Sequence, residues 1–262
     1  MGLTKQASGF STLQENFLPT GSNDYVVALA GNPNAGKSTV FNALTGLKQH
    51  TGNWPGKTVL QARGKFTHQG HNFTLVDLPG TYSLLANSVE EQVARDFICF
   101  GRPDVTVVVV DATSLERHLN LVLQITETTN AVVVCLNLMD EARRKKIAID
   151  VPLLASELGV PVVPTAARRG EGLARLKDVI AAVATGTLRP VPTPIIYDAD
   201  IEAAAGRLAR QLQPLLRGRL NARWVALRLL EGDAALIEGI QQFLGTDLSG
   251  PGTKLHLKEV LA

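Results

Sequence analysis

The 262-residue sequence has few cysteines, little net charge and no long apolar run, and each shortage argues against a class of protein. Its only two cysteines, Cys99 and Cys135, lie in apolar segments, which excludes a disulfide-stapled secreted domain and favours buried free thiols. A formal net charge of +2 is too near neutral for a dedicated nucleic-acid binder. The longest apolar runs, 105–110 and 131–139, are far shorter than the roughly 20 residues of a membrane-spanning helix. No signal-peptide pattern opens the chain, so we expect a soluble, cytoplasmic chain.

Apolar strands that alternate with amphipathic helices are the main pattern that is present. This alternation predicts an α/β fold with a mostly parallel six-stranded sheet and one antiparallel edge strand, contributed by a hairpin. The predicted strands are 25–30, 58–67, 72–77, 104–112, 131–140 and 161–166. The predicted helices are 37–46, 89–100, 114–128, 150–159 and 171–184, with Ser114 and Asp150 as N-caps.

Composition divides the chain into three parts. Residues 1–24 carry little periodicity and are predicted to be a poorly ordered leader, and residues 25–190 form the main domain. A proline-rich stretch, 185–194, breaks the alternation. Residues 191–262 are therefore predicted to be a small all-α domain, with three amphipathic helices between 199 and 244.

A glycine-rich loop carries the first chemical motif. GNPNAGKS (31–38) fits G-x-x-x-x-G-K-[ST] and lies between a predicted strand and a predicted helix, which is the context that the motif requires. Its backbone N–H groups can hold nucleotide phosphates, while Lys37 reaches the β- and γ-phosphates and Ser38 offers a hydroxyl to Mg²⁺. The predicted phosphate-binding residues are Gly31, Asn32, Asn34, Ala35, Gly36, Lys37, Ser38 and Thr39.

The segment DLPG (77–80) follows another predicted strand. Asp77 is placed there to reach the metal through a water molecule, and the N–H of Gly80 can approach the γ-phosphate. In Ras-type GTPases the next residue is a glutamine that orients the attacking water. Here it is Thr81, which is no obvious substitute and leaves open a nucleotide-binding module without turnover.

Two further loops predict guanine recognition. In NLMD (137–140), Asp140 can accept hydrogen bonds from guanine N1–H and N2, and Asn137 can fix the neighbouring loops. A helix cap is the alternative role for Asp140, and both roles can hold together. Leu138 replaces the usual lysine of N-K-x-D. After the last strand, the loop with Thr165, Ala166 and Ala167 would supply a backbone N–H to the guanine carbonyl, and Ala167 is the candidate donor.

These motifs together resemble the translation-factor-related branch of small GTPases. The stretches TGNWPGKTV (51–59), DLPGTYSL (77–84) and DATSLERHLNL (111–121) narrow the resemblance to the N-terminal cytosolic GTPase domain of FeoB, the bacterial ferrous iron transporter, over about residues 25–245. The resemblance implies a P-loop GTPase fold followed by a helical domain that acts as a nucleotide dissociation inhibitor. It also implies that this chain is the cytoplasmic part of an inner-membrane protein, with GTP or GDP and its own membrane domain as partners. No nucleic-acid partner is expected, and a homo-oligomer stays open.

The resemblance carries over three site assignments. It implies that Thr58 joins Ser38 and Asp77 around Mg²⁺, and that Asn34 coordinates an activating K⁺ together with backbone carbonyls of Gly52 and Trp54. The residues implied for slow GTP hydrolysis are Asn34, Lys37, Thr58 and Gly80. Related loops often have a serine where this chain has Ala166–Ala167, which puts base affinity in question.

Several alternatives accompany this interpretation. A free-standing Era-type GTPase of ribosome or RNA metabolism would need a basic RNA-binding module after the main domain, and the mixed charge beyond Pro194 argues against one. Trp54 is either an exposed binding residue or a loop anchor. The basic run 143–146 is either a solvated helix end or a contact for anionic lipid. The five histidines suggest no defensible iron site.

Overall fold

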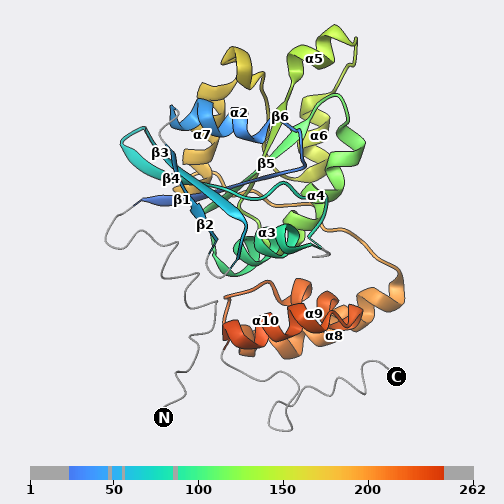
Figure 1. Ribbon diagram of the computed structural model, residues 1–262. Coiled ribbons are helices and arrows are strands. Elements are labelled where there is room, and N and C mark those ends of the chain that lie inside the picture. The colour runs from blue at the N-terminus through green and yellow to red at the C-terminus, as the bar shows by residue number, and fades with distance from the viewer. Residues whose placement is uncertain (1–23, 47–48, 55–56, 85–87, 245–262) are drawn as a thin grey trace, which may run out of the picture. The chain divides into compact units, whose positions relative to one another are not determined.

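Figure 1 shows the computed structural model of the protein, which describes residues 24–46, 49–54, 57–84 and 88–244. The predicted leader lies outside these residues, except for Asp24, and so does the C-terminal end of the predicted helical domain. Within the described ranges, no helix is both long enough and apolar enough to cross a membrane.

A seven-stranded sheet forms the centre of the main domain, in the order β2-β3-β4-β1-β5-β6-β7. Its strands are β1 (Tyr25–Gly31), β2 (Gln49–Asn53), β3 (Leu60–His68), β4 (His71–Asp77), β5 (Val105–Asp111), β6 (Val132–Asn137) and β7 (Val162–Pro164). Neighbouring strands from β4 to β7 pair in parallel, and β3 runs antiparallel to both of its neighbours. The predicted fold class, a mostly parallel sheet with a helical domain after it, is confirmed.

The number of strands and the edge of the sheet differ from the prediction. Residues 49–53, where no strand was predicted, form β2, which pairs antiparallel with β3 and places β3 inside the sheet. The sequence QHTGN has no apolar alternation because its side chains at 50–53 face solvent. Pairing of β2 rests on backbone hydrogen bonds, which leave no pattern in the sequence.

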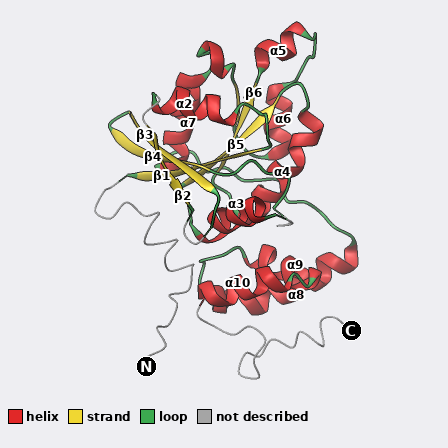
Figure 2. Cartoon of the chain, viewed as in Figure 1, coloured by secondary structure: helices red, strands yellow, loops and turns green. Residues whose placement is uncertain are grey.

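Helices cover both faces of this sheet (Figures 1 and 2). The helices of the main domain are α2 (Lys37–Thr45), α3 (Val89–Phe100), α4 (Leu115–Thr128), α5 (Met139–Arg144), α6 (Val151–Leu158) and α7 (Leu173–Ala184), with the 3₁₀ turn η1 (Ala167–Arg169) before α7. The helices α2 and α7 contact one face, whereas α4 contacts the other and also packs against α3. Burial on both faces explains the unbroken apolar runs of β1, β5 and β6.

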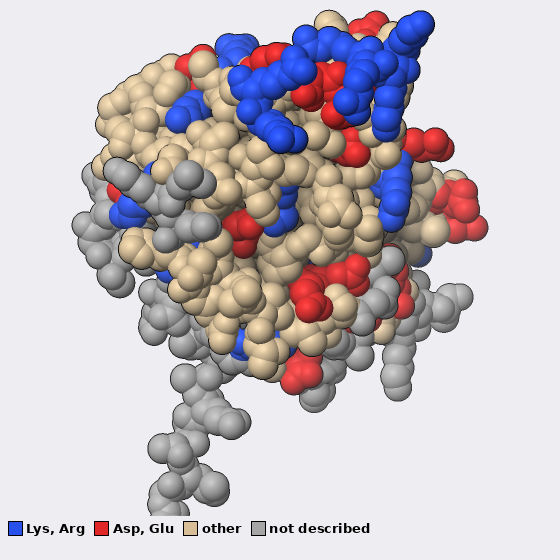
Figure 3. Space-filling model, turned by 45° about the horizontal axis from the view of Figure 1, so that its top comes forward, with Lys and Arg blue, Asp and Glu red and all other residues tan. Residues whose placement is uncertain are grey.

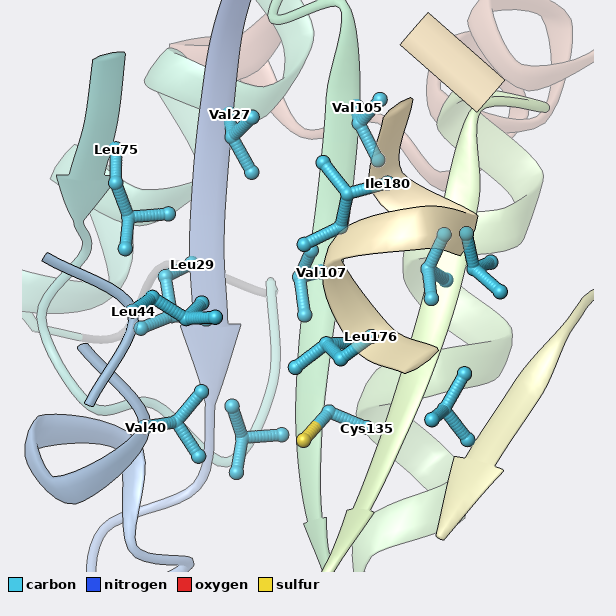
Figure 4. Packing of buried hydrophobic residues seen from close by; sticks show 14 of the residues in the cluster. Val27, Leu29, Val40, Leu44, Leu75, Val105, Val107, Cys135, Leu176 and Ile180 are labelled. Carbon is cyan, nitrogen blue, oxygen red and sulfur yellow. The ribbon is translucent and has the colours of Figure 1, made fainter. Parts of the chain in front are cut away.

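The core between the sheet and the pair α2 and α7 fixes the position of the P-loop (Figure 4). Val27 and Leu29 of β1 pack there with Val40 of α2 and with Leu176 and Ile180 of α7, and all five are buried. Each buried aliphatic side chain contributes about 1.5–3 kcal/mol. Because α2 begins directly at the P-loop, this packing holds the N-terminus of α2 at the carboxyl edge of β1.

The two predicted N-caps, Asp150 and Ser114, both occupy the N-cap positions of their helices. Asp150 caps α6, since its Oδ1 accepts a hydrogen bond from Leu153 N at 2.9 Å, and Gly159 ends α6 in the left-handed conformation, as predicted. Ser114 occupies the N-cap position of α4, as predicted, and its side chain makes no capping hydrogen bond there.

The described residues form two compact units that divide at Thr193–Pro194. The second unit contains α8 (Ala199–Leu216), α9 (Ala222–Glu231) and α10 (Ala234–Leu244), which are the three predicted amphipathic helices. Leu208 and Leu212 of α8 and Trp224 of α9 are buried, and Asn221 caps α9 by accepting hydrogen bonds from Arg223 N and Trp224 N.

Candidate nucleotide-binding site

Two glycines of the P-loop are required by close approach of the backbone. A Cβ atom on Gly31 would lie 2.7 Å from the carbonyl oxygen of Val109 on the neighbouring strand β5. Gly36 has a φ of 84°, and a Cβ there would lie 2.4 Å from Nδ2 of Asn137. Both spaces are closed to any side chain, so the glycine spacing that defines the motif follows from packing against β5 and β6.

A cavity of about 520 Å³ lies at the N-terminus of α2. It is lined by Asn32, Pro33, Asn34, Gly36, Lys37, Ser38, Thr39 and Gly80, so the predicted P-loop residues and the glycine after β4 come together in one place. Ala35 is fully buried within the loop, and Gly31 ends β1 behind it. The unpaired N–H groups of the first turn of α2 give this cavity a positive potential suited to phosphate.

Lys37 and Asp77 form an ion pair beside the cavity. Lys37 Nζ lies 2.5 Å from Asp77 Oδ1, and the two side chains are only 11% and 17% exposed. Burial raises the pKa of Asp77 above its ordinary value, although the ammonium of Lys37 acts in the opposite direction. The pair therefore keeps the ammonium of Lys37 and the carboxylate of Asp77 beside the cavity, where a phosphate and a metal ion would bind.

Asn32 supplies a signal that the sequence did not. Its side chain is 1% exposed, and neither Nδ2 nor Oδ1 has a hydrogen-bond partner among the described residues. Buried amides are almost always hydrogen-bonded, so an amide that is orphaned at both ends and lines this cavity fits a site built for a polar ligand. The sequence predicted only a backbone role for Asn32, because the motif leaves that position unspecified.

Thr81, which replaces the Ras-type glutamine, is not among the described residues that line the cavity. Its hydroxyl donates to the carbonyl oxygen of Ser83 at 2.5 Å, with Glu91 Oε1 at 3.3 Å, and its backbone N–H donates to the carbonyl oxygen of Gly31 at 3.2 Å. The side chain is buried, at 2% exposure. These bonds make Thr81 a structural tie between the loop after β4 and β1.

Asn137 links the P-loop to the loop after β7. Its Nδ2 donates to the carbonyl oxygen of Ala35 at 3.1 Å, and its Oδ1 accepts from Thr165 Oγ1 at 3.2 Å and from Ala167 N at 3.1 Å. All these groups are buried. The arrangement agrees with the predicted role of Asn137 in fixing the neighbouring loops.

The predicted guanine-reading groups have partners within the protein. The N–H of Ala167, the candidate donor to the guanine carbonyl, is bonded to Asn137, and Ala166 beside it is buried with its N–H bonded to Glu171 O. Asp140 Oδ2 lies 3.2 Å from Arg169 Nε. Asp140 is not a helix cap, because Leu138 occupies the N-cap position of α5 and Asp140 lies in the first turn.

Three residues carried over by resemblance lie elsewhere. The cavity lining, as far as the described residues define it, does not include Thr58, Gly52 or Trp54. Thr58 is exposed, Gly52 belongs to β2, and the carbonyl oxygen of Trp54 accepts a hydrogen bond from Lys57 N. The Trp54 ring is 2% exposed and packs edge-on against Phe97 at 5.5 Å, so its interpretation as an exposed binding residue is wrong and it is a loop anchor.

The histidines that the structure describes lie in no metal-binding cluster. In the part of the chain that the structure describes, no three His, Cys, Asp or Glu side chains gather closely enough to hold a metal ion. His68 instead pairs with Asp178, with Nε2 and Oδ1 2.8 Å apart.

The comparison with known families agrees with this geometry. Residues 25–180 match the family model for ferrous iron transport protein B, and residues 197–257 match the model for the FeoB cytosolic helical domain. The chain belongs to the FeoB family. It is 42% identical over 214 residues to the Fe(2+) transporter FeoB of Salmonella typhimurium, covering 79% of this chain and 27% of the relative. It is also 40% identical over 228 residues to an FeoA/FeoB fusion protein of Porphyromonas gingivalis, covering 86% and 26%.

Solved structures of FeoB cytosolic domains have the same architecture. The domain from T. maritima in a GDP form matches with a TM-score of 0.75 at 36% identity, covering 91% of this chain and 92% of that chain. A mutant NFeoB from S. thermophilus bound to GDP matches with a TM-score of 0.77 at 34% identity, covering 90% and 88%. This chain spans about a quarter of the length of the curated FeoB relatives that it matches.

Proposed function

We propose that this chain binds GDP and GTP with Mg²⁺, hydrolyses GTP slowly, and serves as the cytoplasmic nucleotide switch of a bacterial ferrous iron transporter. The observation that carries the proposal is the P-loop cavity, with the Lys37–Asp77 pair at one side and Asn137 tying it to the loop that contains Ala167. The GDP forms of the related FeoB cytosolic domains and the Fe(2+) transport for which the relatives are named support it.

The phosphates of the nucleotide would occupy the cavity. Lys37 would leave Asp77 for the β- and γ-phosphates, and this exchange frees the Asp77 carboxylate for a metal-bound water. Ser38 lines the cavity and would hold Mg²⁺ directly, with Thr58 joining after the segment around it moves. The orphaned amide of Asn32 would gain a polar partner, which offsets the cost of burying it.

Hydrolysis would depend on backbone groups and on Asn34. Because the Thr81 side chain is bonded to Ser83, the groups left to position water are the backbone of Gly80 and, after rearrangement, that of Thr58. Asn34 is exposed at the cavity, where the oxygen of its side-chain amide could coordinate a cation. Mg²⁺ and K⁺, when bound, would supply positive charge to the phosphate oxygens. Gly52 and Trp54 would contribute carbonyl oxygens only after β2 separates from β3 and the hydrogen bond from Lys57 N to Trp54 O breaks.

Coupling to transport would run through the segments around residues 47–58 and 78–90. These segments would order around the γ-phosphate and relax after hydrolysis, and a membrane domain elsewhere in the full-length protein would sense the change. We place the chain on the cytoplasmic side of the inner membrane, with a second copy as a further partner to be tested. The Era-type alternative is not favoured, because residues 197–257 match the FeoB helical domain.

The test is GTP turnover by this chain in KCl and in NaCl. The wild type should turn over faster in KCl, and Asn34→Ala should lose that stimulation because the cation loses a side-chain ligand. Asn72→Ala is the matched control, since Asn72 is exposed at the opposite end of β4 from Asp77. Equal rates in both salts would contradict potassium activation, and no turnover in KCl or in NaCl would contradict GTP hydrolysis.

A further inference from the structure

The base-reading carboxylate already has a cationic partner in this structure. Arg169 Nε lies 3.2 Å from Asp140 Oδ2. The Asp140 side chain is 19% exposed and that of Arg169 is 65% exposed, so the carboxylate is the more buried partner of the pair. Figure 3 shows a face of the molecule on which Lys and Arg side chains gather with carboxylates among them.

A guanidinium and the edge of guanine present the same chemistry to a carboxylate. Each is planar and points adjacent N–H donors in one direction, which suits bidentate binding by two carboxylate oxygens. Guanine bound through N1–H and N2 therefore needs both carboxylate oxygens of Asp140, and one of them, Oδ2, now lies against Arg169 Nε.

We propose that Arg169 is an internal competitor of guanine for Asp140, and that nucleotide binding requires Arg169 to be displaced from that carboxylate. The inference deepens the proposed function and rests on it, because Asp140 must read the base. Arg169 thereby sets how fast and how tightly guanine nucleotides bind without contacting the phosphates.

Glu171 offers the displaced arginine a second position. Its Oε1 lies 4.0 Å from Arg169 NH1, and its other carboxylate oxygen is paired with Arg143 of α5. The backbone of Glu171 is fixed as well, since its carbonyl oxygen accepts the N–H of Ala166. Arg169 can thus move from Asp140 to Glu171 by a side-chain rotation, while the backbone hydrogen bond between Ala166 and Glu171 stays intact.

The size of the effect follows from the exposure of the pair. Exposed ion pairs contribute little, so removing Arg169 should raise GDP affinity by about two- to fivefold, mainly through faster association. Added salt should shrink the gain, because it screens the competing pair in the wild type. Glu171→Gln should act in the opposite direction, lowering affinity by about twofold, because the alternative position for Arg169 loses its charge.

The experiment measures association and dissociation of a fluorescent GDP analogue with the whole chain at low and high salt. Arg169→Ala is compared with Arg168→Ala, which removes the same charge from the neighbouring exposed position. We expect faster association for Arg169→Ala alone, and loss of the Glu171→Gln effect in the Arg169→Ala background.

Two results would overturn the inference while leaving the proposed function intact. One is GDP binding by Arg169→Ala that equals that of Arg168→Ala. The other is weaker binding by Arg169→Ala than by Arg168→Ala, which would make Arg169 a support of Asp140 and not its competitor. Failure of the wild type to bind the GDP analogue at all would overturn the proposed function and this inference together.

Discussion

Removing the side chain of Asn137 should both destabilise the main domain and disconnect its two nucleotide-binding loops. Three hydrogen bonds of 3.1–3.2 Å disappear in Asn137→Ala. The carbonyl oxygen of Ala35 and the N–H of Ala167 lose the side-chain partner that joins them, and both residues are buried. Thr165 is less affected, because its hydroxyl keeps contacts with Leu136 O and Cys135 Sγ.

The expected cost follows from the groups left without a partner. Each buried polar group that is left unsatisfied costs about 1–3 kcal/mol, and water entering the space left by the amide recovers part of that. We therefore expect Asn137→Ala to lower the free energy of unfolding by about 2–4 kcal/mol. Thr165→Val, which removes only one of the three bonds to Asn137, should cost about 0.5–1.5 kcal/mol.

Urea unfolding of both variants measures this difference. The urea concentration at the midpoint should be highest for the wild type, lower for Thr165→Val and lowest for Asn137→Ala. The slope of the unfolding free energy against urea concentration should not change, because the surface exposed on unfolding stays the same. A loss below about 1 kcal/mol for Asn137→Ala would show that the three bonds do not hold the two loops together.

Three further predictions concern single residues. Gly36→Ala should abolish phosphate binding and lower the melting temperature, because its Cβ would overlap Asn137 Nδ2 at 2.4 Å. Gly70→Ala, in the turn before β4, is the control: its Cβ meets no atom within 4 Å, so the variant should show only the strain of its positive φ. Burial raises the pKa of Asp77, so this carboxyl favours the nucleotide-free fold below its unfolded pKa of about 4 and loses that contribution as pH rises through the folded value. Urea unfolding should therefore show a smaller stability loss between acid and neutral pH for Asp77→Asn than for the wild type. The pKa of the Cys135 thiol is raised to about 12 by burial, so an alkylating reagent at mildly alkaline pH should modify it only after unfolding, as mass spectrometry would show.

Much of the site could be predicted because its motifs are defined by backbone geometry. The spacing of Gly31 and Gly36 is fixed by close contacts with the strands behind them. Asp77 ends a parallel strand, and the carboxyl ends of parallel strands lie at the edge of the sheet where ligands bind. The fold class followed equally directly from apolar runs buried on both faces.

What the sequence could not predict depends on pairing between distant residues. The strand β2 rests on backbone hydrogen bonds to β3, and its side chains show no periodicity. The contact between Arg169 and Asp140 joins the turn η1 to the helix α5, 29 residues apart in the chain, and the orphaned amide of Asn32 becomes visible only once its surroundings are known. A motif specifies which groups are needed, but not what those groups contact when no ligand is bound.

The most direct test of the proposed nucleotide specificity is calorimetric binding of GDP, ADP and xanthosine diphosphate to the wild type and to Asp140→Asn. Guanine donates from N1–H and N2 to a carboxylate, whereas xanthine presents a carbonyl oxygen at the position of N2, which an amide N–H can reach. The wild type should prefer GDP to the other two by at least about tenfold, and Asp140→Asn should lose GDP and gain xanthosine diphosphate. Equal binding of GDP and ADP by the wild type, or an unchanged preference in Asp140→Asn, would contradict the account.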